Sequence, residues 1–479
     1  MIKDRIIDKL NSQSIHDIVS EYVTLKKAGV NYKGLCPFHS DKNPSFYVSP
    51  EKNICHCFVC GKGGAPITFL MEHENISFNE ACHKIADKYH IDLEEEKKEL
   101  TPKEIQDQRD KESMQVIYER VQKFYVDCLF SDTPEAKAAL GYALHRWNEE
   151  TVRDMGIGYA PRRSQEFFDF IKKTGLSWEL CKRAGLIAED EEEKREYAFY
   201  RDRLMIPVRN KWHQVISYTA RTLSDDKDKQ KYINGRESLV FHKSEVLFGL
   251  DTAMKVGARE EAFYIVEGGP DVLKMQQIGA LNTVAPLGTA LTKEQLQQLK
   301  RFHPKLIFIP DADEPGIKAV LKNGRIAMEN GFRVKVKEIP QREETDENGN
   351  THRYKQDADS YLQTLNQLRS LPEQDFIIWM AGKTFPSTKD ASVTETTISD
   401  AVKNICDTLI LEQDEYTQKA LLDALIKQHN GHKALWRNAV NEAKLRRAEE
   451  KAKATQKKSG IDLLKYGFYE QHNCYWSRD

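Results

Sequence analysis

The strongest hydrophobic pattern in the chain runs from Ala262 to Asp313. It begins with the apolar run A-F-Y-I-V and ends with a second run, L-I-F-I-P. Each run has the length and the β-branched or aromatic content of a buried strand. Acidic residues follow both runs: Glu267 after the first, and Asp311 with Asp313 after the second.

The residues between these runs predict a helix over 272–278, a short strand over 282–285 and a helix over 292–302. This β-α-β-α-β order is typical of a parallel sheet, whose ligand crevice lies beyond the carboxyl ends of the strands. Three carboxylates that converge there repel one another unless a cation lies between them. Mg²⁺ and Mn²⁺ are hard ions that prefer oxygen ligands, so the pattern predicts a divalent-metal site.

Helix capping is the alternative explanation for these acids. Asp313 could be an N-cap, because Pro315 suits the first turn of a helix that begins near Gly316. A single acid after a strand usually has such a role. Acids after two separate strands are harder to explain by capping alone, and they favour the metal site.

The acids and their flanking residues resemble the Toprim domain. Glu267 corresponds to the single Glu of that family, and Asp311 and Asp313 correspond to its Asp-x-Asp pair. The segments V-E-G-G-P-D-V, G-T-A-L-T and D-A-D-E-P-G-I-K-A are similar to those of DnaG-type bacterial primases. The resemblance implies a catalytic role for all three acids.

A second acidic pair, Asp357 and Asp359, follows a predicted strand over 333–339 and a polar segment with an expected hairpin tip at 348–349. The primases have Asp-Pro-Asp after a shorter loop, so this chain carries an insertion and an Ala in place of the Pro. The resemblance extends the catalytic set to both acids of this pair and the magnesium-binding set, which already includes Glu267, Asp311 and Asp313, to Asp357. The alternative is that both acids cap a helix over 360–368.

Two cysteine-containing knuckles lie near the N-terminus. Cys36 and His39 form C-x₂-H, and Cys57 and Cys60 form C-x₂-C. This spacing fits a closed, tetrahedral structural zinc site. Free cysteines in a reduced protein are the alternative.

Two spare donors, Cys55 and His56, lie next to the second knuckle, and either could replace a ligand. The surrounding C-P-F-H, P-S-F and H-C-F-V-C-G-K-G-G segments resemble the zinc-binding domain of the same primases, which implies contact with a single-stranded template. Aromatic side chains beside lysines are consistent with base stacking and phosphate contact. For Phe46 and Phe58 we instead expect a place in the small core of the ribbon.

Residues 195–236 contain ten Lys or Arg and five Asp or Glu, interleaved with aromatic residues, and strands are predicted over 203–208 and 215–219. This composition suits a groove for single-stranded nucleic acid, although composition alone favours an ordinary solvated sheet face. The segments Y-A-L-H-R, A-R and K-Y-I-N are similar to primase segments. The resemblance implies that five residues bind template or nucleotide: Arg146, Arg221, Lys231, Tyr232 and Asn234. Trp147 departs from the family, which usually has Gly there.

Composition sets wider limits. The formal net charge is −2, so any nucleic-acid surface is a local patch. Nine cysteines, an odd number, argue against a disulfide framework. The sequence has no apolar run long enough to span a bilayer and begins with a charged amphipathic helix, which predicts a cytoplasmic protein without a membrane partner.

The predicted fold class is multidomain α+β and α/β, with an N-terminal zinc ribbon, a mixed α+β basic subdomain, a Toprim parallel-sheet domain and a C-terminal helical region. The predicted segments are a template-binding ribbon (1–95), a linker and connecting helix (96–130), a basic subdomain (131–257), a Toprim catalytic domain (258–370), a helical region (371–458) and a tail (459–479). The tail resembles the opening of a further β-rich unit and fits a phage-like or mobile-element lineage.

The resemblance implies a DNA primase that makes short RNA primers on single-stranded DNA. Its implied cofactors are one structural Zn²⁺ and two catalytic Mg²⁺ or Mn²⁺ ions. Its implied partners are single-stranded DNA, ribonucleoside triphosphates and a replicative helicase. Two alternatives remain: a Toprim nuclease, which would not carry the ribbon, and a catalytically weak single-strand-binding accessory protein, suggested by Gly269-Pro270 and by the insertion before Asp357.

Overall fold

In a computed structural model, the chain forms two compact units, residues 1–106 and 107–479. The described residues run from 4 to 475. They exclude 40, 42–43, 75, 94–100, 193, 225, 227, 258, 289, 301, 303–304, 341, 346–350, 355–356, 387–393, 430–432, 460–467 and 470–473. Among the described residues, no helix has both the length and the apolar character needed to cross a membrane.

The first unit packs four helices against a five-stranded antiparallel sheet of order β1-β2-β3-β4-β5. Its elements are α1 (Asp4–Asn11), α2 (Ile15–Val19), β1 (Lys26–Ala28), β2 (Asn31–Gly34), β3 (Phe46–Ser49), β4 (Ile54–Cys57), β5 (Gly63–Gly64), α3 (Pro66–Glu74) and α4 (Phe78–Tyr89). A capping box between Ser77 and Glu80 begins α4.

Phe46 and Phe58 differ in burial. Phe46 is fully buried and contacts Phe69, which confirms its predicted place in the ribbon core. The same prediction for Phe58 is wrong, because its side chain is 73% exposed. Strand β4 ends at Cys57, one residue before Phe58, so Phe58 lies in the knuckle turn instead of on the buried face of the sheet.

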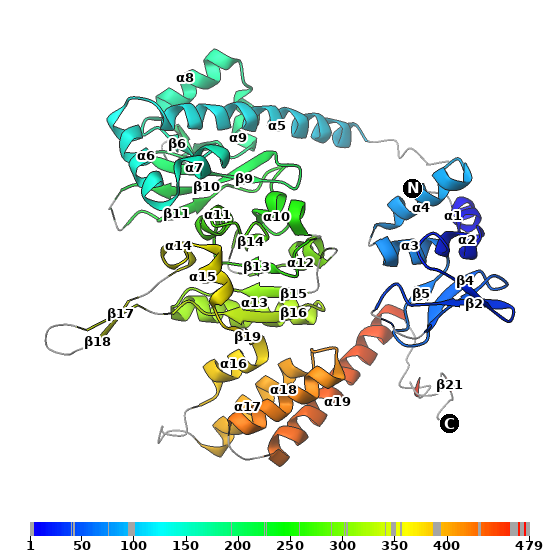
Figure 1. Cartoon of the computed structure of the whole chain (residues 1–479). Helices are drawn as coiled ribbons and strands as arrows, with labels where there is room; N and C mark the ends of the chain where they lie inside the picture. Colours follow the sequence, from blue (N-terminus) through cyan, green and yellow to red (C-terminus); the bar gives the residue numbers. More distant parts are fainter. Residues whose placement is uncertain are drawn as a thin grey trace. The chain divides into compact units, whose positions relative to one another are not determined.

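The second unit begins within a long helix, α5 (Pro102–Leu129), that covers a four-stranded antiparallel sheet of order β11-β10-β9-β6 (Figure 1). Buried tyrosines join the two layers: Tyr118 and Tyr125 of α5 contact Tyr218 of β10. The strands are β6 (Gly158–Ala160), β9 (Arg203–Arg209), β10 (Val215–Thr222) and β11 (Tyr232–Asn234). The surrounding elements are α6 (Pro134–Arg146), α7 (Glu149–Asp154), α8 (Ser164–Thr174), α9 (Trp178–Arg183), β7 (Ile187–Glu189) and β8 (Glu196–Ala198).

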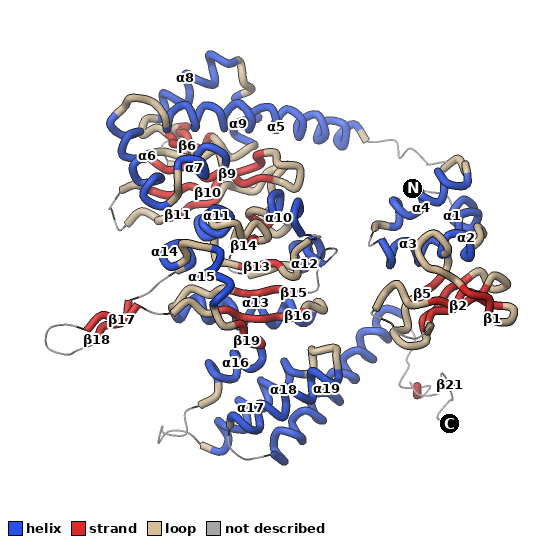
Figure 2. Tube along the Cα trace, in the orientation of Figure 1, coloured by secondary structure: helices blue, strands red, loops and turns tan. Residues whose placement is uncertain are grey.

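A six-stranded sheet of order β12-β14-β13-β15-β16-β19 follows (Figure 2). The four inner strands are parallel, as predicted, and the two edge strands are antiparallel. Its strands are β12 (Leu247–Phe248), β13 (Phe263–Ile265), β14 (Thr283–Pro286), β15 (Lys305–Phe308), β16 (Arg333–Lys337) and β19 (Glu373–Asp375). Its helices are α10 (Leu250–Gly257), α11 (Gly269–Gln277), α12 (Lys293–Lys300) and α13 (Glu314–Glu329).

Between β16 and β19 the chain leaves the sheet. It forms a separate antiparallel hairpin of β17 (Arg342–Thr345) and β18 (Thr351–Tyr354), whose predicted tip at 348–349 lies outside the described residues. The single helix predicted over 360–368 is wrong. The structure has two short helices there, α14 (Ala358–Tyr361) and α15 (Leu365–Ser370), because Leu362 and Thr364 adopt extended backbone angles and Thr364 caps the second helix.

The last helices are α16 (Phe376–Thr384), α17 (Glu395–Leu409), α18 (Glu415–Gln428) and α19 (Lys433–Ser459). Their buried side chains, such as Trp379 and Trp436, belong to the same hydrophobic core as Phe263 and Phe308 of the sheet. The tail contains a short antiparallel pair, β20 (Phe468–Tyr469) and β21 (Cys474–Tyr475).

Two glycines in helices give a test of this packing. A methyl group at Gly324 of α13 would lie 2.3 Å from the Phe376 ring, whereas one at Gly382 of α16 would meet no atom of the described residues within 4 Å. Replacing a helical Gly with Ala normally stabilises by about 1 kcal/mol, but overpacking costs about 1–3 kcal/mol. We therefore expect Gly324→Ala to lower the melting temperature of the second unit in calorimetry and Gly382→Ala to raise it. A higher melting temperature for Gly324→Ala would contradict the packing of α13 against α16.

Candidate functional site

The two knuckles of the first unit converge. One ligand atom from each of Cys36, His39, Cys57 and Cys60 lies within 4.8 Å of the other three. The Cys36 and Cys60 Sγ atoms are 3.7 Å apart, and Cys57 Sγ is 3.8 Å from His39 Nδ1. Tetrahedral zinc with bonds of about 2.3 Å to sulfur requires edges of about 3.8 Å, so these four residues fit a zinc ion.

Backbone N–H groups support the sulfur atoms. Val59 and Cys60 each donate a hydrogen bond of 3.4 Å to Cys57 Sγ, and Phe38 donates one of 3.4 Å to Cys36 Sγ. Burial raises the pKa of Cys57, but these backbone bonds and the Ser45 hydroxyl outweigh it and lower the pKa to about 6. The turn therefore favours the thiolate form that binds metal.

The two spare donors lie outside this group. Cys55 is buried and donates to the Gly64 carbonyl at 3.4 Å, and His56 packs against the Phe58 ring. Gly63 makes this arrangement possible, because a Cβ there would lie 2.2 Å from the Cys55 carbonyl oxygen and its φ is +149°.

In the second unit, a cleft of about 480 Å³ lies at the carboxyl ends of the parallel strands. Acidic and basic side chains line it together. The lining includes seven of the residues predicted from sequence, namely Arg146, Lys231, Tyr232, Asn234, Glu267, Asp311 and Asp357. Asp313, Asp359 and Arg221 are not part of the lining.

Glu267 and Asp311 come together because β13 and β15 are parallel neighbours in the sheet. The Asp311 backbone N–H donates a hydrogen bond of 3.2 Å to Glu267 Oε1. A Cβ at Gly316 would lie 2.3 Å from that same oxygen, so only glycine leaves room for the carboxylate. These two acids therefore meet at the position that the strand order predicts.

Asp313 and Asp357 both cap helices. Asp313 Oδ1 accepts a hydrogen bond of 2.8 Å from the Gly316 N–H at the start of α13. Asp357 Oδ1 accepts one of 2.8 Å from the Ser360 N–H at the start of α14. Burial raises the pKa of Asp357, but hydrogen bonding with Ser360 outweighs it and leaves the pKa below its usual value. Capping uses one oxygen of each carboxylate and does not exclude metal binding by the other.

Sequence analysis did not assign a role to Asp271, which also lines the cleft. Its Oδ2 accepts a hydrogen bond of 3.2 Å from the Gly268 N–H. Burial raises the pKa of Asp271 well above its usual value, and the nearby charges of Asp311, Asp357 and Asp359 raise it further. A signal was present in the sequence, because Asp271 follows Glu267 closely and lies in the first turn of α11.

Arg146 and Asp359 form a mostly buried ion pair between α6 and α14. The Arg146 Nε donates to Asp359 Oδ2 at 2.7 Å, and its Nη2 contacts the same oxygen. Burial raises the pKa of Asp359, and Arg146 only partly offsets this. Its other oxygen, Oδ1, is buried without a hydrogen-bond partner among the described residues. A buried, unpartnered carboxylate oxygen beside several acids fits a divalent cation.

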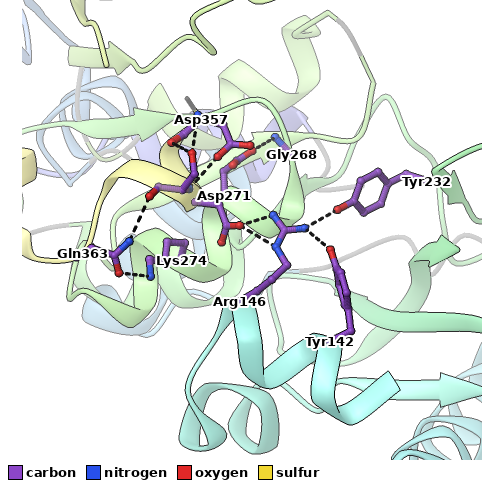
Figure 3. A network of polar contacts seen from close by, with 10 residues as sticks. Tyr142, Arg146, Tyr232, Gly268, Asp271, Lys274, Asp357 and Gln363 are labelled. Atoms are coloured by element: carbon purple, nitrogen blue, oxygen red, sulfur yellow. Dashed lines mark hydrogen bonds and ion pairs between the residues drawn. The ribbon is translucent and has the colours of Figure 1, made fainter. Parts of the chain in front are cut away.

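Aromatic rings hold Arg146, which lines the cleft, and Arg221, which does not. Arg146 Nη1 donates to the hydroxyl oxygens of Tyr142 and Tyr232, at 3.0 Å each (Figure 3). The Arg221 guanidinium lies 4.1 Å from the centre of the Tyr142 ring, and its Nε is buried with no partner in the described part of the chain. Trp147 is buried, with its ring 5.3 Å from the Arg146 guanidinium, so the unusual residue packs behind the arginine.

Asn234 connects the two sheets. Its side-chain Nδ2 donates to the Leu287 carbonyl at 2.9 Å, and its Oδ1 accepts from the Thr219 hydroxyl at 2.8 Å. Both ends of the amide are therefore engaged by protein, and the loop that follows β14 is fixed beside β11.

Comparisons with known proteins agree with this arrangement. Residues 2–101 match the CHC2 zinc finger family, residues 124–254 match the N-terminal domain of the DNA primase catalytic core, and residues 264–349 match the Toprim-like family. The order of the three matches is the order of the ribbon, the four-stranded sheet and the six-stranded sheet.

Three similar proteins are primases. The DNA primase of Listeria monocytogenes is 37% identical over 354 residues, which cover 72% of this chain and 56% of that protein. The DNA primase of Staphylococcus aureus is 36% identical over 348 residues, covering 72% and 57%. The zinc-binding and RNA polymerase domains of the Aquifex aeolicus primase are 28% identical with a TM-score of 0.53, covering 90% of this chain and 98% of that chain.

The chain thus spans a little over half the length of the curated relatives it matches. Within that span it carries a zinc ribbon with a four-ligand metal group, a basic subdomain and a Toprim-like domain with an acidic cleft. The chain therefore carries, in this order, the zinc finger, the catalytic-core N-terminal domain and the Toprim-like domain that are characteristic of DnaG-type DNA primases.

Proposed function

We propose that this chain synthesises short RNA primers on single-stranded DNA by metal-dependent, template-directed joining of ribonucleotides. The observation that carries the proposal is the cleft in which the acids after β13 and β15 face a wall of basic and aromatic side chains. An acidic floor suits divalent cations, and a basic wall suits the phosphates of nucleotide and template. The names of the curated relatives support the same activity.

Glu267, Asp311 and Asp357 are the proposed metal ligands in the cleft. Asp313 stays a proposed metal ligand, beside its role as the cap of α13. Asp359 stays a proposed catalytic residue, and its buried Oδ1 is a further candidate to contact a metal ion. Bound Mg²⁺ or Mn²⁺ would lower the pKa of the attacking 3′-hydroxyl and offset the charge of the leaving pyrophosphate. Glu267 is a further candidate for proton transfer.

The reaction forms a bond between the 3′-oxygen and the α-phosphorus and breaks the bond to the pyrophosphate. The basic side chains of the cleft position the reacting groups, and such positioning supplies much of the rate in phosphoryl transfer. Arg221 and Lys231 are proposed to bind phosphates. Arg146 is proposed to contact template or nucleotide while it holds Asp359, and Tyr232 and Asn234 are proposed to shape the wall.

The ribbon is proposed to hold one structural Zn²⁺ and to contact the template. Phe58 is exposed and contacts the rings of Tyr47 and His56, which gives a surface for base stacking. Lys33 pairs in register with Tyr47 across β2 and β3 and brings a cation to this surface.

Ribonucleoside triphosphates and a replicative helicase are the other proposed partners, and both follow from the family and not from a described contact. The predicted segment boundaries also stay predictions.

Asp311→Asn tests the carboxylate roles. It keeps the shape of the side chain and removes its charge, so we expect primer synthesis on single-stranded DNA to fall at least about 100-fold. The assay is RNA product length with four ribonucleotides and Mg²⁺ or Mn²⁺. Asp423→Asn, at an exposed position of α18, is the control and should keep full activity. Appreciable synthesis by Asp311→Asn would refute its assignment as a ligand.

Arg221→Ala tests the basic wall. Loss of one charge-assisted contact is worth about 1.5–3 kcal/mol, so we expect the KM for ribonucleotides or template to rise about 10-fold or more. Arg195→Ala removes an equal charge at an exposed site of the same basic segment and should have little effect. Equal losses in both variants would indicate a general charge effect and not a defined phosphate site.

Zinc content tests the ribbon. We expect about one Zn²⁺ per chain by atomic absorption, lost in Cys57→Ser and retained in Cys55→Ser, because only Cys57 belongs to the ligand group. Structural zinc contributes directly to folding, so limited proteolysis within residues 1–106 should become faster in Cys57→Ser. The reverse pattern of zinc retention would assign Cys55 as the ligand.

A further inference from the structure

Helix α14 carries Asp357 at its start and Asp359 inside it, yet it is only four residues long. Isolated helices of this length are unstable in water, so its position depends on tertiary contacts. Upstream, the chain leaves the six-stranded sheet and forms the separate β17–β18 hairpin. Among the described residues, the contacts that connect this helix to the rest of the unit come from its own residues and from those that follow it.

A buried lysine supplies one such contact. Lys274 lies on α11, one turn after Asp271, and is 5% exposed. Its Nζ donates a hydrogen bond of 2.9 Å to Gln363 Oε1, and Gln363 Nε2 donates one of 3.3 Å to the Ser360 carbonyl. Figure 3 shows Lys274 beside Gln363 and below the turn that carries Asp357.

The remaining bonds connect this turn to the cleft. The Ser360 N–H donates to Asp357 Oδ1 at 2.8 Å, and the Asp357 N–H donates to Ser360 Oγ at 3.0 Å. Lys274, Gln363, Ser360 and Asp357 therefore form a continuous chain of polar contacts that begins on α11 and ends at the cleft.

The charges of Lys274 and Asp359 also favour this position of α14. A buried ammonium group is costly unless nearby groups compensate it. The carboxylate of Asp359 is close enough for Lys274 to oppose the rise in its pKa that burial causes, as Arg146 also does. The short helix is thus held by Arg146 from α6 and by Lys274 from α11.

We propose that Lys274 and Gln363 form a latch that fixes α14 and thereby positions Asp357 in the cleft. Lys274 and Gln363 are positioning residues and do not touch the reacting atoms. The effect of the latch on metal binding rests on the proposed function of Asp357, whereas its effect on α14 does not.

Hydrogen–deuterium exchange tests the latch without reference to activity. In the full chain, Lys274→Met and Gln363→Leu should each speed exchange of the 357–364 amides about fivefold, because each breaks the same contact. The double variant should be no faster than the faster single variant, since coupled residues are not additive. Lys255→Met, at an exposed position of α10, should leave this exchange unchanged. Unchanged exchange in both single variants, or additive effects in the double variant, would overturn the latch.

Mn²⁺ binding measured by electron paramagnetic resonance tests the positioning of Asp357. Gln363→Leu keeps the lysine charge, so we expect about fivefold weaker Mn²⁺ binding and a matching rise in the Mn²⁺ concentration for half-maximal primer synthesis. The rate at saturating Mn²⁺ should stay within about twofold. Lys274→Met also removes a positive charge near the acids, so it should weaken Mn²⁺ binding less than Gln363→Leu does.

The two proposals fail in different ways. Unchanged Mn²⁺ binding in Asp311→Asn would refute the metal site, while the exchange experiment would still decide the latch. If Asp311→Asn loses Mn²⁺ but Gln363→Leu binds it normally despite faster exchange, then the latch does not position Asp357, and the inference is wrong in that part.

Discussion

Repulsion among carboxylates in one cleft is the constraint on which the second unit depends. Asp271 is buried close to the charges of Asp311, Asp357 and Asp359, and its pKa is raised well above the usual value. In a low-dielectric interior such charges are costly unless cations compensate them. Arg146 and Lys274 supply part of this compensation from the protein, and bound divalent metal ions are our proposal for the remainder.

The ion pair that compensates one of these carboxylates also connects the two sheets. Arg146 belongs to α6 beside the four-stranded sheet, while its partner Asp359 belongs to α14 beside the six-stranded sheet. The Asn234 amide makes a second connection, to the Leu287 carbonyl. Because both contacts bridge the subdomains at the cleft, the basic wall and the acidic floor have a fixed relation. The C-terminal helices add rigidity from the far side, since they share a hydrophobic core with the sheet.

Much of the site was predictable because its chemistry is local. The knuckle residues are set by short spacings, and Glu267 and Asp311 follow two apolar runs that pair as parallel strands. Two predictions were wrong because the sequence did not show where a strand or helix ends. Phe58 is exposed because β4 ends at Cys57, one residue before it. The helix predicted over 360–368 is broken before Thr364. The sequence did not indicate why Trp147 replaces the usual Gly. The contact between its ring and the Arg146 guanidinium is visible only in the tertiary structure.

The sequence by itself determined the order of the domains, the four residues of the candidate zinc site and the strand ends that carry Glu267 and Asp311, because local spacing and hydrophobic pattern fix these features. Only the tertiary structure decided which polar and charged side chains are paired. Arg146 and Asp359 are 213 residues apart in the chain, and Lys274 and Gln363 are 89 apart. No short-range sequence pattern predicts a contact between residues that are so far apart in the chain. Their pairing follows from the packing of α6, α11 and α14 around one cleft, where low dielectric makes an unpaired charge costly.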